Sequence, residues 1–145
     1  MTDFEFHSEW RVAADPDAVY QALVDVAAYP SWWPQVTSAR WLDDGFGEMR
    51  CRAKLPYDLT FRARWVVEDP DNRVLKAELE GDLIGSSQWQ IEADGAGTHA
   101  VFDQAVDVRK RLMRLAVTVG RPALRFNQES MMRGGERGLR GLLES

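Results

Sequence analysis

The stretch D-P-D-A-V-Y-Q-A-L-V-D-V-A-A-Y-P-S-W-W-P, residues 15–34, decides the fold. Asp15 can cap a helix with its side-chain oxygen, and Pro16 suits the first helical position, where a missing N–H costs nothing. Apolar side chains then follow at helical spacing: Val19, Tyr20, Leu23, Val26 and Ala27. Pro30 disfavours helical backbone at Tyr29, so we expect the helix to end there and to run into a tight corner.

Alternation of apolar and polar residues predicts strands on both sides of this helix. One face of a strand before it is formed by Phe4, Phe6, Ser8, Trp10 and Val12. After it, the same two-residue period predicts six strands within 36–42, 49–55, 59–67, 74–80, 89–93 and 100–108. Short turns between consecutive strands are typical of an antiparallel meander, and we expect the first strand to complete the sheet.

From Arg109 onward the period becomes helical. The expected contact stripe is Leu112, Leu115, Ala116, Val119, Ala123, Phe126, Ser130 and Gly134. Gly120 and Pro122 predict a kink or break near residues 118–122. Each glycine in a helix interior costs about 1 kcal/mol, and this helix has Gly134, Gly135, Gly138 and Gly141. These glycines indicate either a fraying tail or a helix that lies close to the sheet or leaves volume beneath it.

One strand, a capped helix, the Y-P-S-W-W-P corner at 29–34, a run of antiparallel strands and a long last helix resemble the START-like, helix-grip (SRPBCC) superfamily. The nearest branch is the bacterial polyketide cyclase/dehydrase and lipid-transport group. The resemblance implies a single α+β domain over residues 1–145. In it a curved antiparallel sheet of about seven strands wraps around a long C-terminal helix, with one or two short helices after the first strand. Members range from lipid carriers to cyclases, so the fold does not dictate a reaction.

Length and composition suit one domain. A chain of 145 residues with 45% hydrophobic content can bury a sizeable core. Cys51 is the only cysteine, so no intramolecular disulfide can form, and its apolar alternation predicts a buried thiol. No apolar run approaches the roughly 20 residues of a membrane span, and the first residues lack the pattern of a signal peptide. We therefore expect a cytoplasmic protein.

Charge is divided unevenly along the chain. Residues 1–108 carry 9 Lys and Arg against 20 Asp and Glu, a net charge of −11, whereas residues 109–145 carry 9 against 3, a net charge of +6. This division predicts a basic last helix on an acidic sheet. A second interpretation is a weak contact with an anionic membrane surface through Arg109, Lys110, Arg111 and Arg114. The acidic remainder argues against a nucleic-acid partner.

Most catalytic motifs are absent from the sequence. It has no G-x-S-x-G, no H-E-x-x-H, no phosphate-binding glycine loop and no dinucleotide fingerprint. His7 and His99 fall on the polar sides of their strands, so we predict surface roles for them and expect no metal site. No organic cofactor is implied.

The six tryptophans are the main functional clue. They form either a plain core or an aromatic cavity between the sheet and the last helix. The expected walls of such a cavity are Trp10, Trp65, Trp89, Phe102 and Phe126, with Ser130 and Gly134 on the helix. The expected polar contacts are Ser8 and Gln104, and the expected rim is Trp32, Trp33 and Tyr57. The link over 81–87 is either a gate or an ordinary surface loop.

The leading hypothesis is binding or transport of a small hydrophobic ligand, such as a lipid, a polyketide or an aromatic metabolite, by a monomer or homodimer. The first alternative is an enzyme similar to polyketide aromatase/cyclases, which needs an acid or base in the pocket. Candidates for that role are Tyr57, Asp58 and Arg52. The second alternative is a protein-interaction module with the basic helix as its contact surface.

Overall fold

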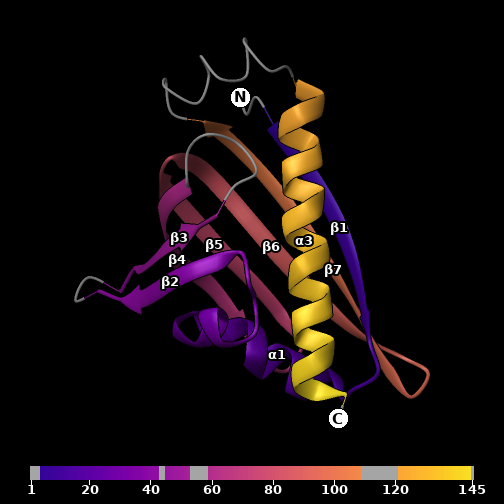
Figure 1. The fold of residues 1–145 in the computed structure, drawn as a ribbon. Helices are drawn as coiled ribbons and strands as arrows, with labels where there is room; N and C mark the ends of the chain where they lie inside the picture. The colour runs from indigo at the N-terminus through magenta and orange to yellow at the C-terminus, as the bar shows by residue number, and fades with distance from the viewer. Residues whose placement is uncertain (1–3, 43–44, 53–58, 109–120, 145) are drawn as a thin grey trace.

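The structure is a computed structural model that describes residues 4–42, 45–52, 59–108 and 121–144. These residues form one antiparallel sheet of seven strands in the order β1-β7-β6-β5-β4-β3-β2 (Figure 1). The strands are β1 (Phe4–Val12), β2 (Val36–Trp41), β3 (Gly47–Cys51), β4 (Leu59–Asp69), β5 (Val74–Gly81), β6 (Leu83–Asp94) and β7 (Gly97–Val108). The strands from β2 to β7 form the meander that the two-residue period predicts, because each pairs with the next in sequence.

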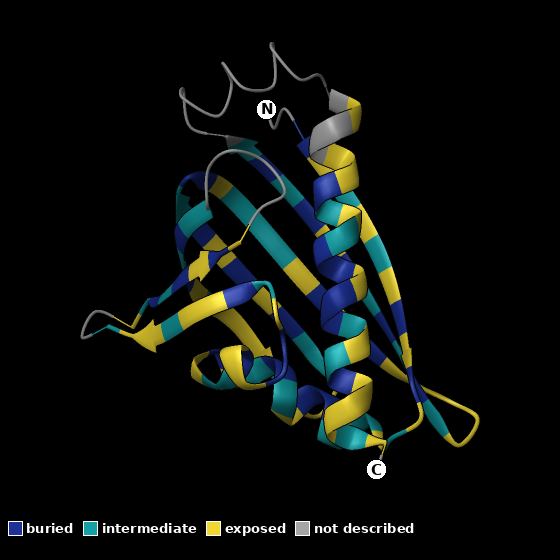
Figure 2. Ribbon diagram, viewed as in Figure 1, coloured by how far each residue is buried: buried dark blue, intermediate teal, exposed yellow. Residues whose placement is uncertain are grey.

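Strand β1 completes the sheet by pairing with β7, in a register that runs from Phe4 opposite Val106 to Val12 opposite Thr98. The predicted alternation in β1 is confirmed at both ends, where Phe4, Trp10 and Val12 are buried. Buried residues also alternate with more exposed ones along β3 and β5, and Figure 2 shows buried and exposed residues interleaved on the sheet. Strand β2 departs from this pattern, because Val36 is its one buried residue. Of the strands, β1 has the most extensive contact with α3, and α1 packs on β6 and β7.

The capped helix starts where predicted, but it ends at Val24 rather than at Tyr29. Helix α1 (Pro16–Val24) begins after Asp15, whose side chain accepts a 3.0 Å hydrogen bond from the backbone N–H of Asp17. A separate 3-10 helix, η1 (Val26–Ser31), contains Tyr29 and Pro30. The prediction that Pro30 ends the first helix is wrong. The hydroxyl of buried Tyr29 instead donates to the carbonyl of Leu23, which gives that carbonyl a partner where α1 ends.

The segment over residues 81–87 belongs mostly to the sheet, so the prediction of a gate or surface loop there is wrong. Strand β6 pairs with β7 from Leu83 opposite Val108 to Ser87 opposite Gln104. Gly85 has a φ of +152°, and a Cβ at this position would overlap the carbonyl of Ala105. The glycine permits close strand pairing here rather than a hinge.

Helix α3 (Arg121–Leu143) lies across the sheet (Figure 1). Its contact face differs from the predicted stripe, because Phe126 is 53% exposed and Ser130 is partly exposed. The buried positions are Asn127, Met131, Met132, Gly134, Gly135 and Leu139. Two of these positions are glycines, which have no apolar side chain, so a search for hydrophobic periodicity does not detect this face. The side chain of Ala123, the stripe residues before Arg121 and most of the region of the expected kink lie outside the described residues.

The glycines of α3 let it approach the aromatic residues beneath it. A Cβ at Gly135 would lie 2.5 Å from Cε2 of Trp33 and 2.7 Å from the ring of Trp10. A Cβ at Gly138 would overlap the carbonyl oxygen of Trp32. Of the alternatives for these glycines, close approach is therefore confirmed. The fraying tail is wrong, since Leu139 is fully buried inside the helix.

Candidate functional site

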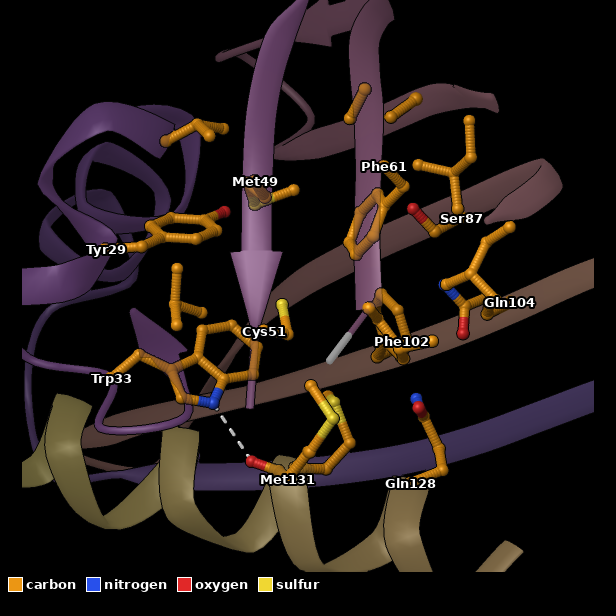
Figure 3. Close-up of a pocket in the computed structure, with 18 of the residues that line it drawn as sticks. Tyr29, Trp33, Met49, Cys51, Phe61, Ser87, Phe102, Gln104, Gln128 and Met131 are labelled. Carbon is orange, nitrogen blue, oxygen red and sulfur yellow. Dashed lines mark hydrogen bonds between the residues drawn. The ribbon is translucent and has the colours of Figure 1, made fainter. Parts of the chain in front are cut away.

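A pocket of about 90 Å³ lies between the sheet and α3 (Figure 3). Its wall is drawn from η1 and the corner that follows it, from strands β2 to β7 and from α3. Six aromatic residues line it: Tyr29, Trp33, Phe61, Trp65, Trp89 and Phe102. Three polar side chains join them: Ser87, Gln104 and Gln128. Among the described residues of the wall, none is charged.

Trp33 and Trp89 of the pocket wall belong to a tryptophan cluster that also contains Trp10 and Trp32. The ring of Trp33 stacks on that of Trp32 with centroids 5.5 Å apart, and Trp10 meets Trp33 edge-on at 5.3 Å. Trp10 also contacts Trp89 at 4.7 Å. The indole Nε1 of Trp33 donates a 3.0 Å hydrogen bond to the main-chain carbonyl of Met131. This bond orients the Trp33 ring in the wall and ties the corner to α3.

Tyr29 contributes its ring to the wall, but its hydroxyl is already engaged. The hydroxyl donates to the carbonyl of Leu23, and the residue is buried. Burial raises the pKa of the Tyr29 phenol well above its usual range. The phenol therefore stays protonated at neutral pH and does not serve as a base.

The polar side chains of the pocket lie together, on the side that also holds Phe61 and Phe102. Gln104 on β7 lies opposite Ser87 on β6 in the strand register, and α3 supplies Gln128. Figure 3 shows these three side chains on one side of the pocket and Tyr29 and Trp33 on the other. Gln104 is only 8% exposed, and its Oε1 has no hydrogen-bond partner among the residues that the structure describes. A buried amide oxygen without a partner is costly and uncommon.

Sulfur-containing side chains fill part of the wall. They are Met49, Cys51, Met131 and Met132. Cys51 is buried, as its apolar alternation predicts. Methionine side chains adapt to irregular shapes, so this wall can adjust to a ligand.

The structure brings together five of the residues that the sequence predicts for the site: Trp33, Trp65, Trp89, Phe102 and Gln104. Trp65 is held by a 3.2 Å hydrogen bond from its Nε1 to the carbonyl of Val24. The prediction that Trp32 and Trp33 form a rim is wrong, because both are buried in the tryptophan cluster. Tyr57 lies outside the described residues.

The remaining predicted residues do not line this pocket. Trp10 is buried in the core, where its ring meets those of Trp33 and Trp89. Phe126 is largely exposed, and Ser8 lies in a separate groove beside Glu129 of α3. Ser130 is only partly buried, since the helix is rotated relative to the predicted stripe. Gly134 leaves no volume, because a Cβ there would overlap the side chain of Gln35.

Sequence reasoning missed several wall residues. Met49 and Phe61 lie on strand faces that the two-residue period already marks as apolar, so that signal was sufficient to find them. Gln128 and Met131 depend on the rotation of α3, which the glycines obscure. Tyr29 lies in η1, where no regular period applies.

The two histidines lie on the outer, polar face of the sheet, as predicted. Nδ1 of His7 lies 2.6 Å from Asp103 and its Nε2 lies 3.2 Å from Glu9, which also contacts Nε2 of His99 at 2.7 Å. Hydrogen bonds that the His7 ring donates to these carboxylates, first to Asp103 and then to Glu9, raise the pKa of His7. With both ring nitrogens facing carboxylates, the imidazolium form fits best because it donates from both.

Neither a metal cluster nor a membrane span is found in the part of the chain that the structure describes. No group of three or more His, Cys, Asp or Glu side chains in these ranges is arranged to hold a metal ion. None of the described helices combines the length and the apolar character needed to cross a bilayer. The basic segment 109–114 falls outside these ranges.

Comparisons with known proteins support the fold. Residues 3–144 match the model of a family described as polyketide cyclase/dehydrase and lipid transport. A START superfamily protein from Mycobacterium smegmatis is similar in structure, with 15% identity, a TM-score of 0.73 and 97% of each chain covered. The Zhui aromatase/cyclase from Streptomyces sp. R1128 is also similar, with 17% identity, a TM-score of 0.75, and 97% of this chain and 93% of that chain covered.

A third similar structure is the protein TTHA0849 from Thermus thermophilus, with 20% identity, a TM-score of 0.69, and 95% of this chain and 99% of that chain covered. At these identities the neighbours show the fold alone. No curated protein matches the chain in sequence. The predicted helix-grip architecture is thus confirmed by the seven-stranded sheet, its C-terminal helix and these neighbours.

Proposed function

We propose that this chain, which belongs to the polyketide cyclase/dehydrase and lipid-transport family, binds a small hydrophobic molecule in its interior pocket. The observation that carries the proposal is the wall of the pocket, which is aromatic, aliphatic and sulfur-rich, with no charged side chain among its described residues. Such a wall favours apolar ligands, because burial contributes about 25 cal/mol for each Å² of apolar surface removed from water.

The size of the pocket favours a compact ligand. Its volume is about 90 Å³, whereas an apolar cavity of about 150 Å³ is known to admit benzene. A molecule with a single ring fits after small side-chain movements, for which the methionines of the wall are suited. A polyketide or a lipid chain requires a larger opening. An aromatic metabolite is therefore the ligand class that the pocket supports best.

The cyclase alternative needs a group that moves protons inside the pocket. The described residues of the wall include no Asp, Glu, His, Lys or Arg. The phenol of Tyr29 is engaged with Leu23, and Arg52 is exposed and is not among the residues that line the pocket. These observations favour binding over acid–base chemistry. The remaining candidates, Tyr57 and Asp58, lie outside the described residues, as does the basic segment on which the interaction-module alternative depends.

Calorimetric titration with para-xylene tests the proposal. We expect one molecule bound per chain and a negative heat-capacity change, as burial of apolar surface requires. Ala77 is a buried wall residue, so Ala77→Leu should occupy the pocket and weaken binding at least tenfold. Ala93 is exposed on β6, the strand next to that of Ala77, so Ala93→Leu is the matched control and should leave the affinity unchanged.

Two results would count against ligand binding in this pocket. One is the absence of any binding heat with the folded wild-type protein. The other is equal affinity in the two leucine variants, because para-xylene would then occupy some other surface.

A further inference from the structure

We propose, on the premise that the pocket binds a ligand, that this ligand is electrically neutral and donates a hydrogen bond to Oε1 of Gln104. A phenol or another ring that carries a hydroxyl group has this chemistry. Gln104 thereby becomes the residue that determines specificity in a pocket whose other contacts are mostly apolar.

The first step of the argument is the unpaired oxygen. Oε1 of Gln104 is buried without a hydrogen-bond partner in the described ranges, in a side chain that is 8% exposed and lines the pocket. A buried amide oxygen without a donor destabilises the folded protein, and a ligand that supplies an O–H or N–H removes this cost. A ligand that carries only acceptors leaves it in place.

The second step is the absence of charge in the described wall. A carboxylate, phosphate or ammonium group that entered the pocket would lose its hydration without gaining an ion-pair partner there. The groups available to it are Ser87, Gln104 and Gln128, which are neutral. The pocket therefore selects neutral molecules over ionised ones of the same shape.

The third step is the grouping of the polar side chains within the pocket. Figure 3 shows Ser87, Gln104 and Gln128 on one side, beside Phe61 and Phe102, and Tyr29 and Trp33 on the other. The indole N–H of Trp33 is engaged with the carbonyl of Met131, so its side of the pocket offers ring surface. A ligand with one polar end is thus best oriented with its donor towards Gln104 and its ring against the aromatic walls.

Four probes of nearly equal shape test this inference by calorimetric titration: para-cresol, para-methylanisole, para-xylene and para-toluate. Para-cresol carries a donor, para-methylanisole replaces it with an ether, para-xylene has no polar group, and para-toluate is ionised at neutral pH. We expect wild-type protein to prefer para-cresol over para-methylanisole by about tenfold, which matches one hydrogen bond to a buried acceptor. Para-toluate should not bind measurably.

A pair of variants assigns this preference to Gln104. Gln104→Leu should abolish the preference for para-cresol while retaining para-xylene binding, which also shows that the variant is folded. Gln90 is exposed on β6, so Gln90→Leu is the matched control and should behave as wild type. If Gln104→Leu does not fold, the comparison of para-cresol with para-methylanisole on wild-type protein still decides whether a donor is required.

The outcomes separate this inference from the proposed function. If no neutral probe binds the wild-type protein, ligand binding itself fails. If para-xylene binds but para-cresol has no advantage over the ether, or the advantage survives in Gln104→Leu, the assignment to Gln104 is overturned and ligand binding stands. Tight binding of para-toluate would overturn the selection for neutral molecules.

Discussion

The indole Nε1 of Trp33 donates a 3.0 Å hydrogen bond to the main-chain carbonyl of Met131, which joins the corner after η1 to the middle of α3. Both residues also line the pocket. The bond therefore fixes the distance between two walls that are 98 positions apart in the sequence. It links the stability of the fold to the shape of the site.

Replacing Trp33 with phenylalanine should lower the free energy of unfolding by about 1 to 3 kcal/mol, because the hydrogen bond is lost and the smaller ring leaves space in the tryptophan cluster. Urea unfolding followed by circular dichroism measures this change. Trp41 is 44% exposed, so Trp41→Phe is the matched control and should change stability by less than about 0.5 kcal/mol. Equal losses in the two variants would mean that the bond to Met131 contributes nothing.

Two glycine substitutions in α3 should have opposite signs. Gly141→Ala meets no atom within 4 Å, so it should stabilise the protein by up to about 1 kcal/mol through helix propensity. Gly135→Ala places its Cβ against the buried rings of Trp10 and Trp33, so it should destabilise by about 1 to 3 kcal/mol despite the same gain. Thermal or urea unfolding of both variants measures the difference. Stabilisation by Gly135→Ala would show that the helix does not approach the rings this closely.

Gln104→Leu should raise the stability of the ligand-free protein by about 1 kcal/mol or more, because it removes a buried oxygen that has no partner. Urea unfolding without any added probe measures the gain, and Gln90→Leu again serves as the control. A stabilising change at a residue that is needed for specificity is the usual mark of a functional site. A clear loss of stability would indicate that the amide already has partners in solution.

The cluster of His7, Glu9 and Asp103 should make stability depend on pH. The pKa of His7 is raised above its usual 6.5. Its contribution to the free energy of unfolding is therefore complete below pH 6.5 and is lost as the pH rises through the higher pKa of the folded state. The pKa of Glu9 is lowered from 4.5, so its contribution is present above that pH and is lost on acidification. Both contributions are thus present between about pH 5 and pH 6.5.

His7→Gln should therefore lower the urea midpoint at about pH 5.5 and have little effect at about pH 9. The loss should be small and should shrink in 1 M salt, since these side chains are about half exposed and screened by water and ions. Asp103→Asn removes the largest cause of the raised His7 pKa, so the urea midpoint should depend less on pH over the same range. A loss that is equal at both pH values would point to packing rather than charge.

Much of the fold could be predicted because its signals are local. The cap at Asp15 acts within one helical turn, and the structure contains its hydrogen bond to Asp17. The alternation at Phe4, Trp10 and Val12 requires only a two-residue period, and all three side chains are buried. Strand parity also placed Trp89, Phe102 and Gln104 on the inward face, and all three line the pocket.

The phase of α3 could not be predicted in this way. Hydrophobic periodicity detects apolar side chains. Gly134, Gly135 and Gly138 lie close to the corner and to β1 because they have no side chain, so the periodicity does not detect them. The stripe therefore appeared to run through Phe126, which is exposed, instead of through Met131, which lines the pocket. The orientation of this helix depends on the bulk of rings that are distant in sequence.

The sequence by itself determined most of the strands, the start of the capped helix and the inward position of Gln104, since each depends on residues within a few positions of one another. Only the tertiary structure decided that Trp33 is bonded to α3 and that Oε1 of Gln104 has no partner in the described part of the chain. Whether a buried polar group is paired depends on what distant segments place beside it, and that is a property of packing rather than of local pattern.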